Sequence, residues 1–211
     1  MDARRSELLK ASPRMFDSDL LDMLSRVHPA VPVVIYVPAI ALLVGFALAT
    51  GGVSLLGGLG LFAGGYAFWT LCEYWIHRII FHFEPEDGFG ARLHWIIHGV
   101  HHDHPNDPLR LVMPPSVSVP LSTLFCVGFW AILGTPLWYA FGAGFLAGYL
   151  IYDMTHYHLH HHKPKTRAGK RLRELHMRHH FQDDTTGFGI SAPYWDTAFR
   201  THSPKAKKPG S

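Results

Sequence analysis

Four blocks of apolar residues divide the chain and predict long helices in a membrane. The first block covers residues 30–50, and the second covers residues 53–81 and is long enough to project beyond the bilayer. Two shorter blocks, residues 119–133 and 137–154, are joined by residues 134–136. About 20 apolar residues suffice to cross the hydrocarbon core. We therefore predict an all-α integral membrane protein with about four transmembrane helices in two hairpins.

The polar residues 1–28 predict a short amphipathic helix ahead of the first span. It would lie at the membrane surface or cap the polar part of the protein. The first apolar block begins too late and is too long for a cleaved signal sequence. We expect an amphipathic segment at 1–28, a membrane domain at 29–202 and a disordered basic tail at 203–211. The apolar side chains that recur at helical spacing are Phe16, Leu20, Leu21, Leu24 and Val27.

Positive charges and histidines fall on the same side of this arrangement. Two hairpins place both termini and residues 82–118 on one side of the membrane, and the uncharged linkers 51–52 and 134–136 on the other. The positive-inside rule makes the first side cytoplasmic, so the histidines are expected in a cytoplasmic helical cap. The cations that set this orientation are Arg4, Arg5, Lys10, Arg14, Lys163, Lys165, Arg167, Lys170, Arg171 and Arg173.

Composition supports a membrane protein and limits the possible partners. Hydrophobic residues make up 48% of the chain and charged residues 17%, with the apolar residues gathered in blocks. The net charge is only +3, and the cations do not alternate with stacking aromatics, which argues against nucleic acid. Cys72 and Cys126 lie in apolar blocks and form no CxxC pair, so neither a disulfide framework nor a thiolate zinc site is indicated.

Histidine is the unusual feature of the composition. The chain has 17 histidines, and all except His28 and His202 lie between His77 and His180. Helical residues three and four apart share a face, so three of the groups below present their imidazoles in one direction, as metal ligation requires. The four groups are His77 and His82; His98, His101 and His102; His156 and His160; and His176, His179 and His180.

His77 and His82 need another geometry because they are five residues apart. That spacing is about 140° around an ideal α-helix, so both side chains reach one centre only if the helix ends or kinks between them. The charged stretch 84–88, which contains Pro85, supplies such an ending.

Ten histidines predict a site for two metals with positions left for oxygen or water. Imidazole suits iron, zinc, copper or nickel and does not suit magnesium or calcium; spacing alone does not select iron. Single histidines are often only surface residues. His158 lies about 200° from His156 on a helix, so it and His162 are expected to point elsewhere, while His94 and His104 are candidates for contacts outside the ligand set.

Three carboxylates are candidates to orient the ligands. A ligand histidine usually donates its second ring nitrogen to a carboxylate or carbonyl, and Glu73, Asp153 and Asp196 fit that role. Glu73 lies one turn before His77 in an apolar block, where an ionisable group is costly and indicates function. Its alternative is an ion pair with Arg78 at the interface.

These motifs resemble the fatty acid 2-hydroxylase branch of the membrane fatty acid hydroxylase and sterol desaturase superfamily. The segments 110–115 and 187–195 favour this branch over its sterol, carotenoid and alkane-modifying relatives. The matching segments, in order, are 77–82, 98–102, Pro105, Asp107, 110–115, 152–157, 159–161, 176–180, 187–189 and 195–196.

The resemblance implies an O2-dependent monooxygenase with two iron ions that hydroxylates a free, activated or lipid-linked fatty acid at C2. Zinc could replace iron in purified material. Relatives often carry a cytochrome b5-like domain, which 28 polar residues cannot contain, so a separate cytochrome b5-like protein, ferredoxin or reductase is the expected electron donor. The endoplasmic reticulum or bacterial inner membrane is the expected location. His161 is implied to be a non-ligand, and the implied ligands are His77, His82, His98, His101, His102, His156, His160, His176, His179 and His180.

Two other functions stay open. The segment 110–115 argues against a sterol, carotenoid or lipid-headgroup hydroxylase, which stays the nearer alternative. A metal-binding or transport protein would need polar groups near the bilayer midplane, whereas residues 30–50 and 119–133 carry no charged side chain. The glycine pairs 60/64 and 144/148 either let helices pack closely or line an acyl slot, and packing is the favoured interpretation.

Overall fold

The computed structural model describes residues 3–203, in which every regular element is helical. The predicted disordered tail therefore lies outside the described residues, except for Ser203. Two of the elements, η1 and η2, are π-helical. In chain order the helices are α1 (Ala3–Lys10), α2 (Asp19–Leu24), α3 (Ala30–Ala49), α4 (Leu55–Trp75), η1 (Ile76–Phe81), α5 (Gly88–His94), η2 (Trp95–Gly99), α6 (Val100–Asp103), α7 (Pro115–Leu133), α8 (Leu137–His161), α9 (Arg167–Phe181) and α10 (Tyr194–Ala198).

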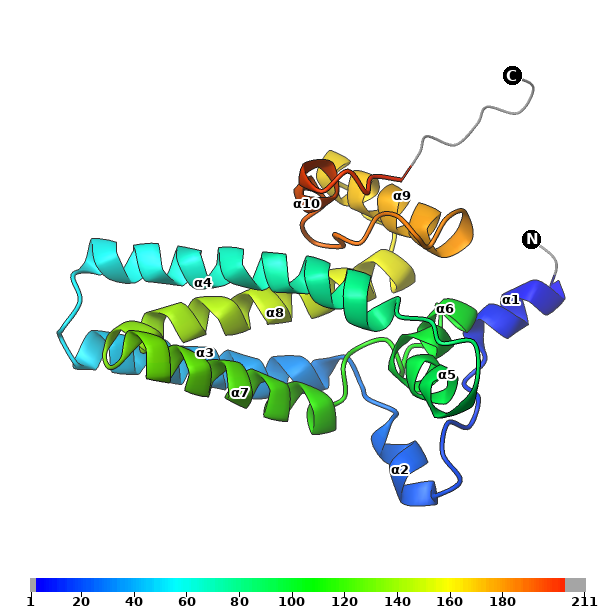
Figure 1. The fold of residues 1–211 in the computed structure, drawn as a ribbon, viewed down its shortest axis with the longest axis horizontal. Coiled ribbons are helices and arrows are strands. Elements are labelled where there is room, and N and C mark those ends of the chain that lie inside the picture. The colour runs from blue at the N-terminus through cyan, green and yellow to red at the C-terminus, as the bar shows by residue number, and fades with distance from the viewer. Residues whose placement is uncertain (1–2, 204–211) are drawn as a thin grey trace.

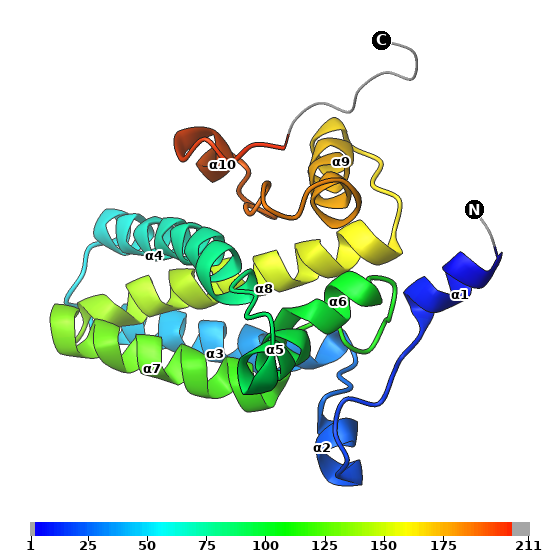
Figure 2. The same ribbon diagram turned by 45° about the vertical axis from the view of Figure 1, so that its right-hand side comes forward.

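Four long helices, α3, α4, α7 and α8, run side by side and form the body of the molecule (Figures 1 and 2). Helix α8 packs against each of the other three. The linkers between α3 and α4 and between α7 and α8 lie at one end of this body, and the short helices gather toward the other end (Figure 1). The core contains Tyr36, Trp69, Phe129, Phe145, Leu146, Tyr149, Tyr152, Leu159 and Ile190.

Three of the described helices are long and apolar enough to cross a membrane, namely α3, α4 continued by η1, and α7. The fourth predicted span, residues 137–154, is the first part of α8. This helix continues to His161, and Asp153 and the histidines of its last turns make it more polar than the other three. The polar end of α8 therefore serves the histidine cluster rather than a fully apolar span.

Glycine lets α4 and α8 approach closely. A Cβ atom added to Gly144 would lie 1.9 Å from the carbonyl oxygen of Phe62, and one added to Gly65 would lie 1.9 Å from that of Phe141. At Gly148 an added Cβ would meet Trp69 at 2.7 Å, whereas at Gly60 nothing lies within 4 Å. The close contacts at 144 and 148 support helix packing, with Gly65 instead of Gly60 as their partner on α4.

Replacement of Gly144 by alanine should therefore lower the stability of the helical body. The new methyl group cannot fit against backbone without moving α4 away from α8, and overpacking of this kind costs about 1–3 kcal/mol. Thermal unfolding in detergent would measure the effect. Gly60→Ala is the matched control, because it adds a methyl group to α4 in open space and favours the helix. Equal melting temperatures for the two variants would contradict close packing at Gly144.

The amino-terminal segment differs from the single helix that was predicted. Two short helices, α1 at residues 3–10 and α2 at residues 19–24, occupy the predicted amphipathic segment, and Phe16 and Val27 lie outside both. Ser18 begins the helix because its side chain accepts a hydrogen bond from the Leu21 amide, as an N-cap does. Val27 follows this helix, and its amide donates to the Leu109 carbonyl at 2.6 Å.

The carboxyl-terminal segment folds back onto the end of α4. The hydroxyl of Thr70 accepts hydrogen bonds from the Tyr194 hydroxyl and the Trp195 indole at 2.9 and 3.1 Å. The hydroxyls of Tyr74 and Thr201 lie 2.8 Å apart. These contacts position the loop between α9 and α10 beside His77 of η1.

Candidate dimetal centre

Ten histidines from five helical elements and His82 converge into two compact groups. Within each group, one nitrogen from every ring lies within 4.8 Å of the others. These are the same ten residues that the resemblance implied as ligands. Site A contains His77, His82, His98, His102 and His179, and site B contains His101, His156, His160, His176 and His180.

A π-helical turn brings His77 and His82 to the same site although they are five residues apart. The amide of His82 donates to the carbonyl of His77 at 3.2 Å, which is the i→i+5 bond of a π-helix. The Nε2 atoms of the two rings consequently lie 3.3 Å apart. The predicted end or kink between them is thus a wider helical turn that closes at His82.

Two of the other histidine groups, at residues 98–102 and 176–180, are each divided between the sites. His98 and His102 belong to site A, with Nε2 atoms 3.0 Å apart, whereas His101 between them belongs to site B. On α9 the order is reversed: His176 and His180, 3.1 Å apart at Nε2, belong to site B. His179 belongs to site A. Residues four apart therefore share a site, and the residue three along serves the other.

The nitrogen spacing fits a metal ion at each site. His77 Nδ1 lies 2.7 Å from the Phe188 carbonyl, and His179 Nδ1 lies 2.7 Å from the Thr186 carbonyl. Since a carbonyl accepts only, these Nδ1 atoms carry the proton and each neutral ring has a lone pair on Nε2. His77 and His179 both aim that atom at His82, at 3.3 and 3.0 Å. Metal–imidazole bonds of about 2.0–2.1 Å place adjacent ligands about 2.9–3.4 Å apart.

Site B shows the same need for a cation. The Nε2 atoms of His160 and His176 lie 2.7 Å apart. Among the described residues, the buried Nε2 atoms of His101 and His156 have no hydrogen-bond partner. Buried polar atoms are normally satisfied, so these nitrogens fit a metal. The two sites adjoin, because the ring centroids of His102 and His180 are 4.3 Å apart.

Burial keeps the histidines of sites A and B neutral. It lowers the pKa of His82 to about 3, with a further contribution from nearby His179. It lowers the pKa values of His98, His101 and His176 well below the ordinary range, and surrounding imidazoles add to the effect. Neutral imidazole is the form that binds metal, so the cluster is ready to ligate at neutral pH.

The three candidate carboxylates hold protein segments beside the cluster. Glu73 accepts hydrogen bonds from the amide and hydroxyl of Ser191, while Arg78 donates to the Tyr74 hydroxyl. Glu73 was predicted to be a histidine partner or, alternatively, to pair with Arg78. Its hydrogen bonds to Ser191 instead anchor the loop.

Asp196 and Asp153 also bind backbone amides. Asp196 accepts from the Phe188 and Gly189 amides at 2.8 and 2.9 Å, and so fixes the peptide whose carbonyl holds His77. Asp153 accepts from the Met113 amide and the Tyr149 hydroxyl, both at 3.4 Å. The Nδ1 partners of His77 and His179 in site A are loop carbonyls, which side-chain identity does not reveal. The glycines at 187 and 189 were the signal available in the sequence.

The fatty acid hydroxylase family matches residues 62–201, a range that includes all ten clustered histidines. The chain belongs to this family. The dihydroceramide fatty acyl 2-hydroxylase FAH1 of Arabidopsis thaliana is 39% identical over 206 residues, which cover 95% of this chain and 84% of the relative. The fatty acid 2-hydroxylase of Mus musculus is 40% identical over 151 residues, covering 70% of this chain and 41% of that protein.

A solved structure shares the fold. It is that of full-length scs7p, in which only the hydroxylase domain is visible, with a TM-score of 0.79 and 34% sequence identity. The match covers 92% of this chain and 72% of the other. The predicted resemblance to fatty acid 2-hydroxylases is thereby confirmed.

The remaining histidines of this hydroxylase family member lie outside both sites. His158 and His162 are exposed and stack on each other. His161 is half-buried against Tyr157, with ring centroids 4.4 Å apart. The Nε2 atom of His94 lies 2.7 Å from the Phe81 carbonyl, so His94 supports the residue that precedes His82.

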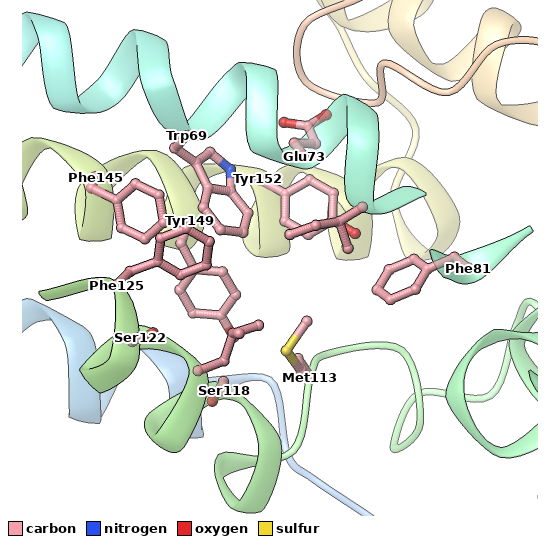
Figure 3. A pocket seen from close by; sticks show the side chains of 12 residues that line it. Trp69, Glu73, Phe81, Met113, Ser118, Ser122, Phe125, Phe145, Tyr149 and Tyr152 are labelled. Atoms are coloured by element: carbon pink, nitrogen blue, oxygen red, sulfur yellow. The ribbon is translucent and has the colours of Figure 1, made fainter. Parts of the chain in front are cut away.

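A mostly apolar cavity of about 250 Å³ opens beside the histidines. Its wall includes His98, His101 and His156, together with Tyr152 and Asp153. A much smaller slot of about 20 Å³ lies between α4, α7 and α8 and shares Phe81, Met113 and Tyr152 with this cavity. Figure 3 shows the slot's aromatic side chains facing one another, with the carboxylate of Glu73 turned away from them.

Proposed function

We propose that this chain hydroxylates a fatty acyl chain at C2 in an O2-dependent reaction, using two iron ions held by the ten histidines of sites A and B. The observation that carries the proposal is the pair of adjacent five-imidazole sites beside a mostly apolar cavity. Membership of the fatty acid hydroxylase family and the names of the similar 2-hydroxylases support the acyl substrate and the C2 position.

Iron is the metal that suits both the ligands and the reaction. Imidazole binds iron and zinc alike, but zinc has no redox chemistry. No amino acid side chain oxidises an unactivated C–H bond, so a redox centre must supply that chemistry. When bound, two iron ions would activate O2 with two electrons and supply the oxidant for the C–H bond.

The protein's own residues position the substrate and the ligands. The cavity wall places apolar side chains such as Val112 and Met113 beside His98, His101 and His156, which fits an acyl chain lying against the centre. The Phe188 and Thr186 carbonyls hold the rings of His77 and His179 in one tautomer and orientation. The buried histidine nitrogens lie away from solvent, which limits side reactions with water.

Orientation and electron supply complete the proposal. We place the histidine end of the molecule at the cytoplasmic face of the endoplasmic reticulum or bacterial inner membrane, because it carries the basic helix α9 and lies away from the uncharged linkers. A separate cytochrome b5-like protein, ferredoxin or reductase would deliver the two electrons there. With this orientation, the histidine sites face the compartment in which such donors are found.

Lipid mass spectrometry of cells with and without the chain tests the function. We expect 2-hydroxyacyl lipids to appear with the unaltered protein and to be lost with His176→Ala. Separate quantification of free fatty acids and ceramides would show which class carries the new hydroxyl group. No gain of 2-hydroxyacyl species, or an undiminished gain in the variant, would reject the proposal. Hydroxylated sterols, carotenoids or headgroups would instead point to the alternative hydroxylases.

A further inference from the structure

The amino-terminal segment forms one wall of the cavity beside the histidines. Met15, Phe16, Leu21, Leu24 and Ser25 all line it. These residues precede the part of the chain that matches the family, which begins at residue 62. The segment that was predicted to lie at the membrane surface or to cap the polar part of the protein is therefore a component of the pocket.

The cavity reaches the surface between α2, η2 and the start of α7. Four of its lining residues are also large exposed hydrophobics: Leu21 and Leu24 are each 50% exposed, Ile97 is 43% exposed and Val117 is 53% exposed. Residues that line a cavity and reach the surface mark its opening. Val117 lies in α7, which is apolar enough to span a membrane, so this opening adjoins the predicted lipid-facing surface.

A buried charge network fixes α2 in this position. The Asp22 carboxylate accepts hydrogen bonds from the Met15 amide at 2.7 Å and from Arg110 at 2.9 Å. Its other oxygen accepts two from Arg26, both at 3.2 Å. Asp22 thus anchors α2 by its inner face, which leaves Leu21 and Leu24 beside the cavity.

Two arginines of the histidine-bearing part hold the preceding loop. Arg110 donates to the carbonyl of Pro13, and Arg92 donates to the carbonyl of Met15. Arg110 begins the segment 110–115, and residues 110–114 also line the cavity. The segment 110–115, which favoured the 2-hydroxylase branch in the sequence, therefore forms one wall of the cavity. Through Arg110 it also holds the amino-terminal segment that forms another wall.

We infer that α2 and the first turn of α7 form a lateral portal, through which the acyl chain of a bilayer lipid reaches the histidine sites. This inference rests on the proposed function. The occupant is an acyl chain because the opening is apolar, adjoins a candidate membrane span and leads directly to His98, His101 and His156. Leu21 and Leu24 select the lipids that pass, since they stand at the opening.

Substitutions on α2 test the portal, because this helix carries two matched pairs of exposed apolar residues. Leu21 and Leu24 line the cavity, whereas Leu20 and Met23, which are 59% and 61% exposed, do not. We expect Leu21→Asp and Leu24→Asp to lower the 2-hydroxylated fraction of long-chain lipids about tenfold or more, because apolar chains must pass a hydrated carboxylate. Leu20→Asp and Met23→Asp should stay within about twofold of the unaltered protein.

Two further measurements separate the portal from damage to the fold. Metal content and melting temperature should be unchanged in all four variants. Leu24→Trp keeps the opening apolar but narrows it. This variant should hydroxylate bulky lipids less, relative to slim lipids, than the unaltered protein does. Met23→Trp should leave that ratio unchanged.

The outcomes distinguish this inference from the proposed function. Equal losses from the cavity-lining and outward-facing pairs would show that α2 only contacts the membrane, and would overturn the portal. Full activity in Leu21→Asp and Leu24→Asp would overturn it as well. An inactive unaltered protein would instead reject the proposed function.

Discussion

Replacement of His160 by alanine is expected to empty site B and abolish hydroxylation. His160 lies 2.7 Å from His176 at Nε2, and it supplies one of the five imidazoles of site B. Removal of a group that merely orients a ligand costs about 10–100-fold in metal affinity or activity, so loss of the ligand itself should exceed about 100-fold. Metal analysis after anaerobic purification, together with lipid mass spectrometry, would measure both effects.

His158 provides the matched control on the same helix. It lies two residues before His160, is exposed, and stacks only on His162 among the ring contacts of the described residues. His158→Ala should keep both metals and full activity. If the two variants behaved alike, either with both active or with both inactive, the division of α8 into a ligand face and a solvent face would be wrong.

The second large effect on metal affinity or activity is expected at Asp196, a carboxylate outside the ten-histidine cluster. Asp196→Asn replaces one of the two oxygens that receive the Phe188 and Gly189 amides with an NH2 group, which cannot accept from an amide. The Phe188 carbonyl should then shift and release the ring of His77. We expect a loss of about 10–100-fold in metal affinity or activity.

The measurement that isolates this effect is a metal titration of site A. Asp196→Asn should weaken the metal that binds beside His77 more than the metal in site B, and iron spectroscopy should report the change in ligand geometry. Asp184→Asn is the control, because Asp184 is an exposed carboxylate in the same loop. Equal weakening of both sites would show that Asp196 acts on the fold as a whole.

Histidine spacing predicted the cluster, but it did not predict the division into two sites. The i, i+3 and i+4 pattern predicts only that three rings share a helix face. Because the two sites adjoin, rings on that face can reach either site. His101 and His179 turn to the site opposite that of their neighbours. That choice depends on how η2, α6 and α9 pack together, which is a property of the tertiary structure.

The membrane helices were predictable because long apolar blocks leave few alternatives. The π-turn at His77 was not, since five-residue spacing is equally compatible with a helix end. The partners of the carboxylates were missed for a related reason: Glu73 and Asp196 accept from backbone amides of a loop, and every residue type except proline supplies an amide N–H. The amino-terminal wall was missed because its apolar residues also fit a surface helix.

The sharing of α9 between the sites has a consequence for assembly. This one helix gives His179 to site A and gives His176 and His180 to site B. A metal bound in either site would fix α9 and so arrange the ligands of the other, because metal binding is coupled to folding where the ligands come from separate segments. Loading should therefore be cooperative, with the singly loaded form scarce, and chelation of one ion should promote release of its neighbour.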